Sequence, residues 1–185
     1  MECRVAVSEA DQMAILHQRY DVFVEEFHYL TPKEDNKQLE YDSYDKQSLL
    51  FGVWDQEVLI ASCRLIFADS IFGLPTYNSL IINSEQLSND RQTAEISRIL
   101  IAREHRVFHK TLKILTLMQK EINSVAIQHG IEQLIGVVEP SFLHLLNYAH
   151  LPYITIGPLQ HHIGPDRYPV MLTLSSDTIM PKESL

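Results

Sequence analysis

The chain has 185 residues, of which 45% are hydrophobic and 21% are charged. It contains 15 basic and 24 acidic residues. These proportions are ordinary for a globular chain and exclude collagen, a long coiled coil and bulk disorder. The net charge of −9 disfavours binding to nucleic acid or to an anionic membrane surface. We therefore expect a single domain over residues 1–185 with no nucleic-acid partner.

The remaining composition narrows the class further. The six glycines are too widely spaced for a GxGxxG or Walker A loop. Charged residues near the N-terminus exclude a signal-peptide core, and no apolar run approaches the roughly 18 residues of a membrane span. We expect a cytoplasmic protein without integral membrane association. Cys3 and Cys63 are too few for a disulfide framework or a zinc site, and Cys63 is interpreted as buried.

Hydrophobic spacing divides the chain into alternating helices and strands. A first helix is predicted to begin after the capping residue Ser8, and the polar residues 31–47 that follow are interpreted as a long exposed loop. A hairpin is predicted from residues 48–54 and 57–67, joined at Asp55-Gln56. The other elements expected are a turn region at 73–78, a strand at 94–101, a helix at 105–129 that ends before Gly130, a strand at 132–138, a helix at 140–149, strands at 153–156 and 168–174, and a frayed tail from about 176.

This order predicts an α/β (α+β) fold, with helices packed on a mixed sheet. The strands at 94–101 and 132–138 are expected to lie side by side and parallel, because the long helix between them suits a crossover connection.

Charged residues inside apolar strands mark a candidate site. Arg64 lies inside the second hairpin strand, and Glu95 and Arg98 lie inside the next strand. Such charges are costly to bury unless they are paired. They form either a buried ion pair that fixes the sheet or a polar slot where a carboxylate acts on a ligand. In a regular strand Glu95 and Arg98 face opposite sides, and they share a side only if the strand bulges.

Asp42 and Asp45, in the sequence EYDSYD, could hold a cation or an amine, or could belong to a solvated loop. Arg19 lies one helical turn from Phe23 and, on composition alone, is an ordinary surface charge. The nine histidines show no pattern of the HExxH type, so we expect no metal site.

A local positive segment stands out in the acidic chain. Residues 103–120 hold five basic residues and one acidic residue, and Arg106, Lys110 and Lys113 are expected on one helical face. With Arg103 they form either a solvated face or a docking surface for an anionic partner.

Four motifs in order, RYDVFVEEFHYL, EYDSYD, CRLI and AEISRILI, resemble the autoinducer-synthase-like branch of the GNAT acyltransferases. This branch includes acyl-homoserine-lactone synthases, N-acyl amino acid synthases and exosortase-associated acyltransferases. The resemblance covers about residues 12–105, and GPLQHHIGPDRYPV adds a weaker match. It implies a GNAT-type, mostly antiparallel sheet and the transfer of an acyl group from a thioester to an amine.

The resemblance also implies roles for individual residues. Glu95 would be the base, acting with Arg64 and Arg98. The substrate-binding residues would be Arg19, Phe23, Tyr29, Asp42, Asp45, Ser97 and Ile99, with backbone N–H groups of the 97–101 strand on the thioester carbonyl. Tyr29 stands where the homoserine-lactone synthases usually have Trp, and Leu74 where they usually have Phe.

The resemblance implies no tightly bound cofactor, with acyl carrier protein or coenzyme A as the acyl donor. The basic residues Arg103, Arg106, Lys110 and Lys113 would meet the carrier protein. The acceptor would be the amine of an amino acid or a related small molecule. Two alternatives stay open: an acyl-homoserine-lactone synthase that uses S-adenosylmethionine, and a domain that binds an acyl thioester without turnover.

Overall fold

The computed structural model describes residues 1–34, 37–68, 73–83, 85, 87 and 91–174. Its strands form one mixed, mostly antiparallel sheet in the order β1-β2-β3-β4-β5-β8-β6, and β7 pairs with β8. The strands are β1 (Glu2–Val5), β2 (Ser48–Asp55), β3 (Val58–Phe67), β4 (Thr93–Ile101), β5 (Gln133–Val138), β6 (Ile154–Thr155), β7 (Gln160–His161) and β8 (Asp166–Thr173). The predicted fold class is confirmed.

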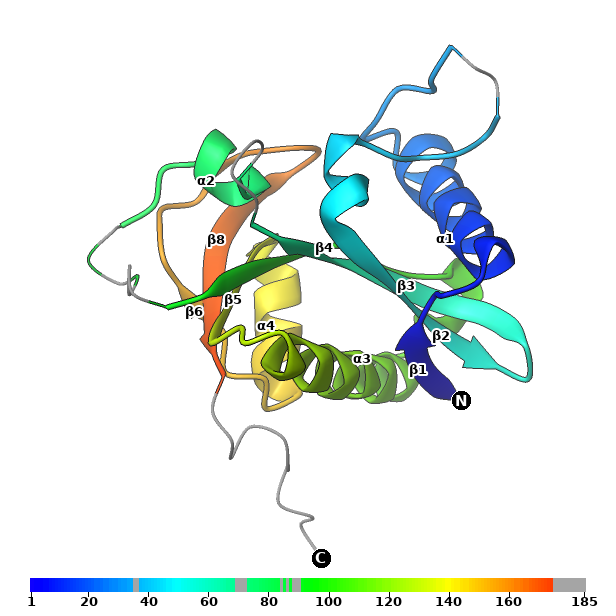
Figure 1. Cartoon of the computed structure of the whole chain (residues 1–185). Helices are drawn as coiled ribbons and strands as arrows, with labels where there is room; N and C mark the ends of the chain where they lie inside the picture. Colours follow the sequence, from blue (N-terminus) through cyan, green and yellow to red (C-terminus); the bar gives the residue numbers. More distant parts are fainter. Residues whose placement is uncertain (35–36, 69–72, 84, 86, 88–90, 175–185) are drawn as a thin grey trace, which may run out of the picture.

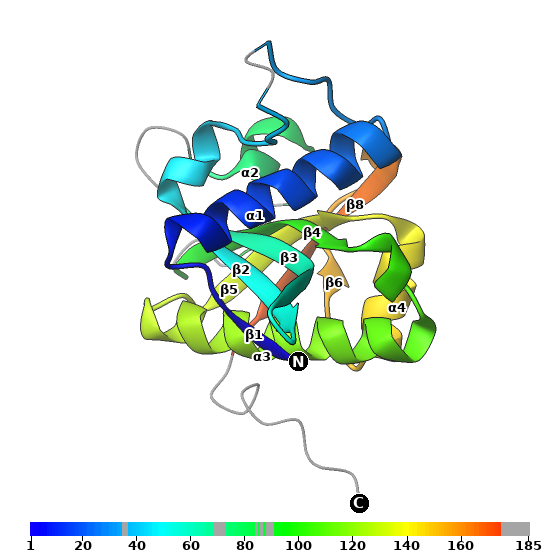
Figure 2. The same cartoon turned by 90° about the vertical axis from the view of Figure 1, so that its right-hand side faces the viewer.

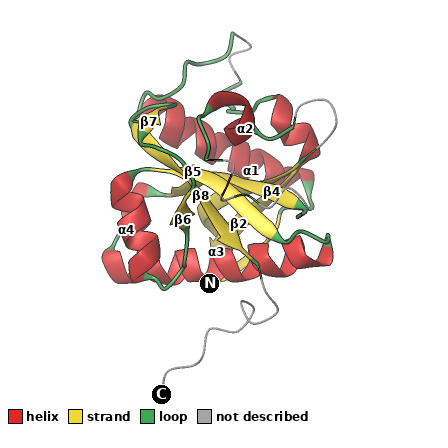
Figure 3. Ribbon diagram, turned by 90° about the vertical axis from the view of Figure 1, so that its left-hand side faces the viewer, coloured by secondary structure: helices red, strands yellow, loops and turns green. Residues whose placement is uncertain are grey.

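Helices cover both faces of this sheet (Figures 1 and 2). One face carries α1 (Glu9–Tyr20), which continues into the π-helical turn η1 (Asp21–Glu26), and also α2 (Pro75–Ser79). The other face carries α3 (Phe108–Gln128) and α4 (Pro140–Tyr148), and Figure 3 shows the twisted sheet between these layers. The largest apolar cluster lies between the sheet and α3, where Leu65, Leu134 and Ile114 are fully buried.

The parallel pair predicted in the middle of the sheet is present. β4 pairs with β5 from Thr93 with Gln133 to Ile96 with Gly136, where the ladder ends. A Cβ atom at Gly136 would lie 2.8 Å from the Ile96 carbonyl oxygen, so only glycine permits this approach. Beyond this point the two strands part, which opens the sheet at its centre.

Local signals in the sequence located most elements. Ser8 caps α1 and accepts a hydrogen bond from the Asp11 N–H, and Gly130 ends α3 with a φ of +73°. The predicted hairpin is β2–β3, but its turn is centred on Gln56 and Glu57, whose φ angles of 50° and 68° suit a tight hairpin turn.

Several predictions were wrong in detail. β1 and β7 were not predicted, because strands of four and two residues leave too short a pattern. The turn region at 73–78 holds α2, which begins at Pro75. The helix predicted from 105 begins at Phe108, an exposed residue whose ring contacts the exposed Tyr148 of α4 edge to face. The predicted tail from 176 lies outside the described residues.

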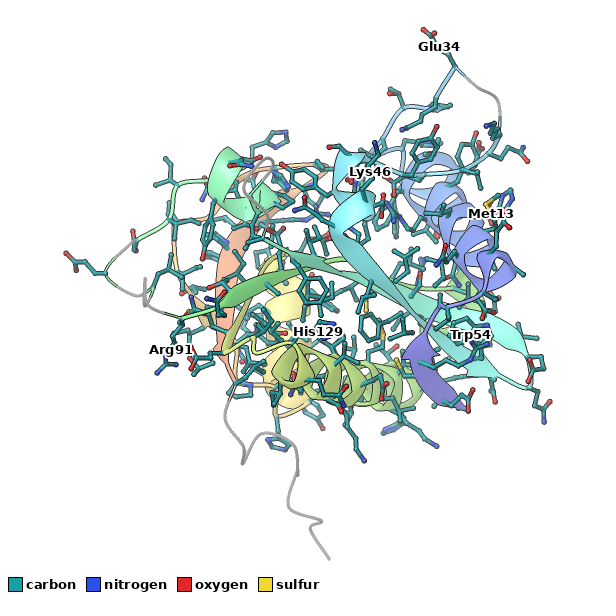
Figure 4. All side chains as sticks on the ribbon, in the orientation of Figure 1. Met13, Glu34, Lys46, Trp54, Arg91 and His129 are labelled. Atoms are coloured by element: carbon teal, nitrogen blue, oxygen red, sulfur yellow. The ribbon has the colours of Figure 1, made fainter. Side chains whose placement is uncertain are left out.

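The predicted exposed loop at 31–47 is also corrected. It ends in the 3₁₀ helix η2 (Ser43–Gln47), and its residues Leu39 and Glu40 are buried. Glu34, by contrast, lies at the tip of the loop and points away from the sheet (Figure 4). Among the described residues, no helix combines the length and apolar character needed to span a membrane.

Candidate active site

Three arginines and three carboxylates form a closed ring of alternating charge on the face of the sheet that carries α1. In order around the ring they are Arg19, Glu40, Arg98, Asp42, Arg64 and Asp45. They come from α1, β3, β4 and the segment between η1 and β2. Three positive and three negative charges cancel, which is the condition for burying so many ions together.

The contacts in the ring are short, and each arginine binds one of its carboxylates through two nitrogens. Arg19 Nη1 donates to Asp45 Oδ1 at 2.8 Å, and Arg19 Nε donates to Glu40. Arg64 Nη1 lies 2.6 Å from Asp42 Oδ1 and 3.0 Å from Asp45 Oδ1. Arg98 Nη2 bridges Glu40 and Asp42 at 3.0 and 3.2 Å. Such paired geometry fixes each guanidinium plane as well as its charge.

Burial and charge act against each other on the carboxylates of the ring. Burial disfavours the ionised form of Glu40, but the charges of Arg19 and Arg98 outweigh it and hold the pKa of Glu40 below its ordinary value. Burial also opposes ionisation of Asp45, and hydrogen bonds from Arg19 and the charge of Arg64 lower its pKa to about 2. All three arginines are therefore matched by ionised partners at neutral pH.

A β-bulge brings Arg98 onto the ring's side of the sheet. The register of β3 against β4 shifts between Ser62, opposite Leu100, and Arg64, opposite Ser97. Arg98 itself has a φ of +52°, which is unusual for a residue other than glycine. In a regular strand the side chains of Glu95 and Arg98 would point to opposite faces of the sheet. The extra residue at the bulge shifts this alternation by one, so the two side chains share a face.

Glu95 forms no ion pair with any of the described residues. It is 1% exposed, and Oε2 accepts a hydrogen bond of 2.8 Å from the Thr76 N–H at the start of α2. Burial raises the pKa of Glu95 to about 7, although Thr76 and the charges of Arg64 and Arg98 favour ionisation. A carboxylate with this pKa can accept and release a proton near neutral pH.

A cavity of about 410 Å³ opens where β4 and β5 part. On β4 its wall includes the polar residues Ser97 and Arg98, and toward α3 and α4 the wall is largely apolar. The apolar lining residues include Leu115, Met118, Ile122, Leu145, Leu146 and Leu151. A second cavity of about 460 Å³ adjoins it at Phe23, Tyr29 and Ile99 and leads toward Phe108 at the start of α3. The pair of cavities offers a path from the surface to the centre of the sheet.

The cavities separate the predicted site residues into two groups. Phe23, Tyr29, Ser97, Ile99 and Arg98 line one cavity or both. The other predicted residues lie in the wall of neither cavity: Arg64 and Glu95, together with Arg19, Asp42 and Asp45. Arg19 is also no surface charge, since it is 1% exposed within the ring.

Three residues of the candidate site were not identified from the sequence. Glu40 begins the quoted motif EYDSYD, but nothing in its spacing sets it apart from the exposed acidic residues nearby. Arg167 and Glu139 line both cavities and form an ion pair of 3.3 Å. The Arg167 guanidinium lies over the Tyr29 ring, 5.6 Å from its centroid. No local pattern joins residues so far apart.

The predicted docking segment is only partly available. Arg106 does not lie on the helical face, because it precedes α3, and it is held by two bonds to Glu26 and one to the Ile101 carbonyl. Lys110 lies 3.7 Å from Asp55, while Arg103 and Lys113 are exposed. The free positive surface is therefore smaller than expected.

The family model for the acetyltransferase (GNAT) domain matches residues 18–116, which hold the charged ring and all of β4. The chain belongs to the acetyltransferase (GNAT) domain family. The match spans more than half of the chain, so the expected GNAT fold and acyltransferase class are confirmed. No curated protein matches the chain.

Solved structures with this GNAT fold extend over nearly the whole chain. BjaI, a CoA-dependent acyl-homoserine lactone synthase with SAM and isopentyl-CoA, is 18% identical at a TM-score of 0.73, covering 96% of this chain and 84% of its own. TofI, in a ternary complex with an inhibitor and MTA, is 20% identical at 0.71, with 97% and 95% covered. FeeM, an N-acyl amino acid synthase from uncultured soil microbes, is 17% identical at 0.69, with 93% and 90% covered.

Proposed function

We propose that the protein transfers an acyl group from an acyl thioester to the amine of an amino acid or a related small molecule. The observation that supports this most directly is the cavity at the point where β4 and β5 part, which has the polar residues Ser97 and Arg98 on β4 and a largely apolar wall toward the helices. A thioester carbonyl would lie at the polar end, beside Ser97 and Arg98, and its hydrocarbon chain would fill the apolar end.

The reaction needs a base and a stabilised oxyanion. The amine nitrogen attacks the thioester carbonyl carbon, the carbon–sulfur bond breaks, and the amine proton must be removed. Glu95 is the proposed base and would take that proton through a bridging water, since its carboxylate lies behind the cavity wall. Backbone N–H groups of residues 97–101, released from β5 by the splay, would donate to the carbonyl oxygen.

Arg98 and Arg167 are the proposed anchors for an acceptor that carries a carboxylate. Both line the first cavity. Burial lowers the pKa of His162, and the charges of Arg167 and Arg98 lower it further. Arg98 Nη1 makes no hydrogen bond to another described residue, while Nε and Nη2 are held by the ring. The charged ring would thus act by positioning Arg98, with Arg19, Arg64, Asp42 and Asp45 as positioning residues.

No tightly bound cofactor is proposed, and the acyl donor would be acyl carrier protein or coenzyme A. Carrier proteins are strongly acidic, so the positive surface formed by the exposed Arg103 and Lys113 and the half-buried Lys110 is the proposed docking site. Reversal of these three residues to Glu should slow transfer from the carrier protein, mainly at low salt, and leave a short pantetheine thioester unaffected. Equal loss with both donors would contradict docking at this surface.

One alternative rests on the fold shared with BjaI and TofI, which favours acyl-homoserine-lactone synthesis from S-adenosylmethionine. The deciding experiment incubates the purified protein with acyl carrier protein or coenzyme A thioesters, and with amino acids or S-adenosylmethionine. Thiol release and product mass are then measured for the wild type and Glu95→Gln. An N-acyl amino acid supports the proposal, and an acyl-homoserine lactone supports the alternative. A bound thioester without any product would show a binding domain and overturn both.

A further inference from the structure

A polar pair interrupts the apolar wall of the first cavity. Gln119, on α3, and Tyr153, just before β6, both line the cavity and are both buried. The Tyr153 hydroxyl donates to Gln119 Oε1 at 2.8 Å, and Gln119 Nε2 donates to Asn123 Oδ1 at 2.7 Å. The neighbouring wall on α3 is formed by the apolar side chains of Leu115, Met118 and Ile122. A buried polar pair on such a surface requires an explanation.

The pair lies deeper than the point where the central strands part. β6 follows Tyr153 directly. Its first residue, Ile154, pairs with Met171 of β8, and Met171 also pairs with Ile135 of β5, so Ile154 and Ile135 lie at the same level of the sheet. The β4–β5 ladder ends one residue later, at Gly136. The Gln119–Tyr153 pair is therefore on the closed side of the opening, away from Arg98 at the polar end. An acyl chain that enters at the opening would reach the pair with a distal part of its length.

The pair keeps unused hydrogen-bonding capacity. A glutamine amide has two N–H donors, and a tyrosine hydroxyl oxygen can accept while it donates. Within the described residues, Gln119 Nε2 donates only to Asn123, and the Tyr153 oxygen acts only as a donor. Burial also raises the pKa of Tyr153 well above its ordinary value, so the hydroxyl keeps its proton. One N–H and one hydroxyl oxygen remain for a ligand.

We propose that Gln119 and Tyr153 make the cavity selective for acyl chains that carry a hydroxyl or keto oxygen on a distal carbon. This specificity rests on the proposed acyl transfer. The oxygen would accept from Gln119 Nε2, and a distal hydroxyl would also donate to the Tyr153 oxygen. An unsubstituted chain is still admitted, because the Tyr153 hydroxyl, Gln119 Oε1 and Gln119 Nε2 each keep one hydrogen bond when no such oxygen is present.

The test compares acyl thioesters of equal length, from hexanoyl to dodecanoyl: unsubstituted, hydroxylated next to the thioester end, and hydroxylated at the far end. One net hydrogen bond should raise kcat/KM for the best distally hydroxylated chain about three- to tenfold over the unsubstituted chain. Tyr153→Phe and Gln119→Met, which conserve volume, should bring this ratio close to one. Tyr148→Phe, at an exposed tyrosine outside both cavities, is the matched control and should keep the wild-type ratio.

The outcomes separate this specificity from the function on which it rests. If no thioester is turned over, the proposed acyl transfer fails. If unsubstituted chains are turned over and the wild type prefers no distal oxygen at any length, the acyl transfer stands and the specificity is overturned. If Tyr153→Phe lowers kcat/KM equally for all acyl chains and leaves the ratio of hydroxylated to unsubstituted chains unchanged, the pair stabilises the core and does not determine the specificity for the chain. The wild-type comparison decides the question even if a variant does not fold.

Discussion

Replacing Glu95 by Gln should make the protein more stable at pH 8 while abolishing its activity. The folded-state pKa of Glu95 is about 7, against 4.5 for an ordinary glutamate. Between these values the folded protein keeps a proton that the unfolded chain has lost, so stability decreases as pH rises. At 1.36 kcal/mol per pH unit, this interval corresponds to about 3 kcal/mol. Because Glu95 is only 1% exposed, solvent screening reduces this free energy only slightly.

The measurement is urea unfolding of the wild type and Glu95→Gln from pH 4.5 to pH 8. A glutamine can still accept the hydrogen bond from the Thr76 N–H, so the two proteins should be similarly stable at the acidic end. The variant should then gain about 3 kcal/mol over the wild type as pH rises through 7. Glu34→Gln, at the tip of the loop, is the control and should follow the wild type. Parallel curves for wild type and Glu95→Gln would refute the raised pKa and remove the physical basis for Glu95 as the base.

Further predictions concern the charged ring. Glu40→Gln leaves Arg19 and Arg98 short of a buried counter-charge and should lower the free energy of unfolding by about 3 kcal/mol in urea, against less than about 0.5 kcal/mol for Glu34→Gln. Asp45, with its pKa lowered to about 2, should contribute about 2 kcal/mol above pH 4 that is lost as pH falls toward 2. Asp45→Asn should remove that part of the acid dependence in the same assay, and an unchanged acid limb would contradict the ring.

The sequence predicted the parts of the fold that local periodicity controls. The β2–β3 hairpin, β4, β5 and α3 each carry an apolar pattern of the right period, and all are present within a few residues of the predicted bounds. The crossover helix also implied the parallel pairing of β4 with β5, which the register confirms. Of the charges predicted inside these strands, Arg64 and Arg98 join the charged ring and Glu95 is buried beside α2, while their roles in a site stay a prediction.

The parts that the sequence did not predict depend on contacts across long separations. Glu40 is buried because Arg19 and Arg98, 21 and 58 residues away, both bind it. The bulge at Arg98 needs a positive φ, and arginine gives no local sign of that conformation. The pairing of Gln119 with Tyr153 likewise joins α3 to the segment just before β6, 34 residues away, and neither residue differs in its sequence context from an ordinary core position.

The charged ring and Glu95 are connected by electrostatics. Arg64 and Arg98 act on Glu95, and two cations close to a carboxylate normally lower its pKa. The pKa stays raised because burial of Glu95 outweighs these two charges, and both arginines are held in ion pairs with Glu40, Asp42 and Asp45 within the ring.

Removing one ring carboxylate should therefore change the base as well as the stability. In Glu40→Gln, Arg98 keeps only Asp42, and its less compensated charge should lower the pKa of Glu95. The acid limb of the kcat/KM profile should then move from near pH 7 to lower pH, while Glu34→Gln leaves it in place. An acid limb that stays at pH 7 in a folded Glu40→Gln protein would show that the ring only braces the sheet and does not set the proton affinity of Glu95.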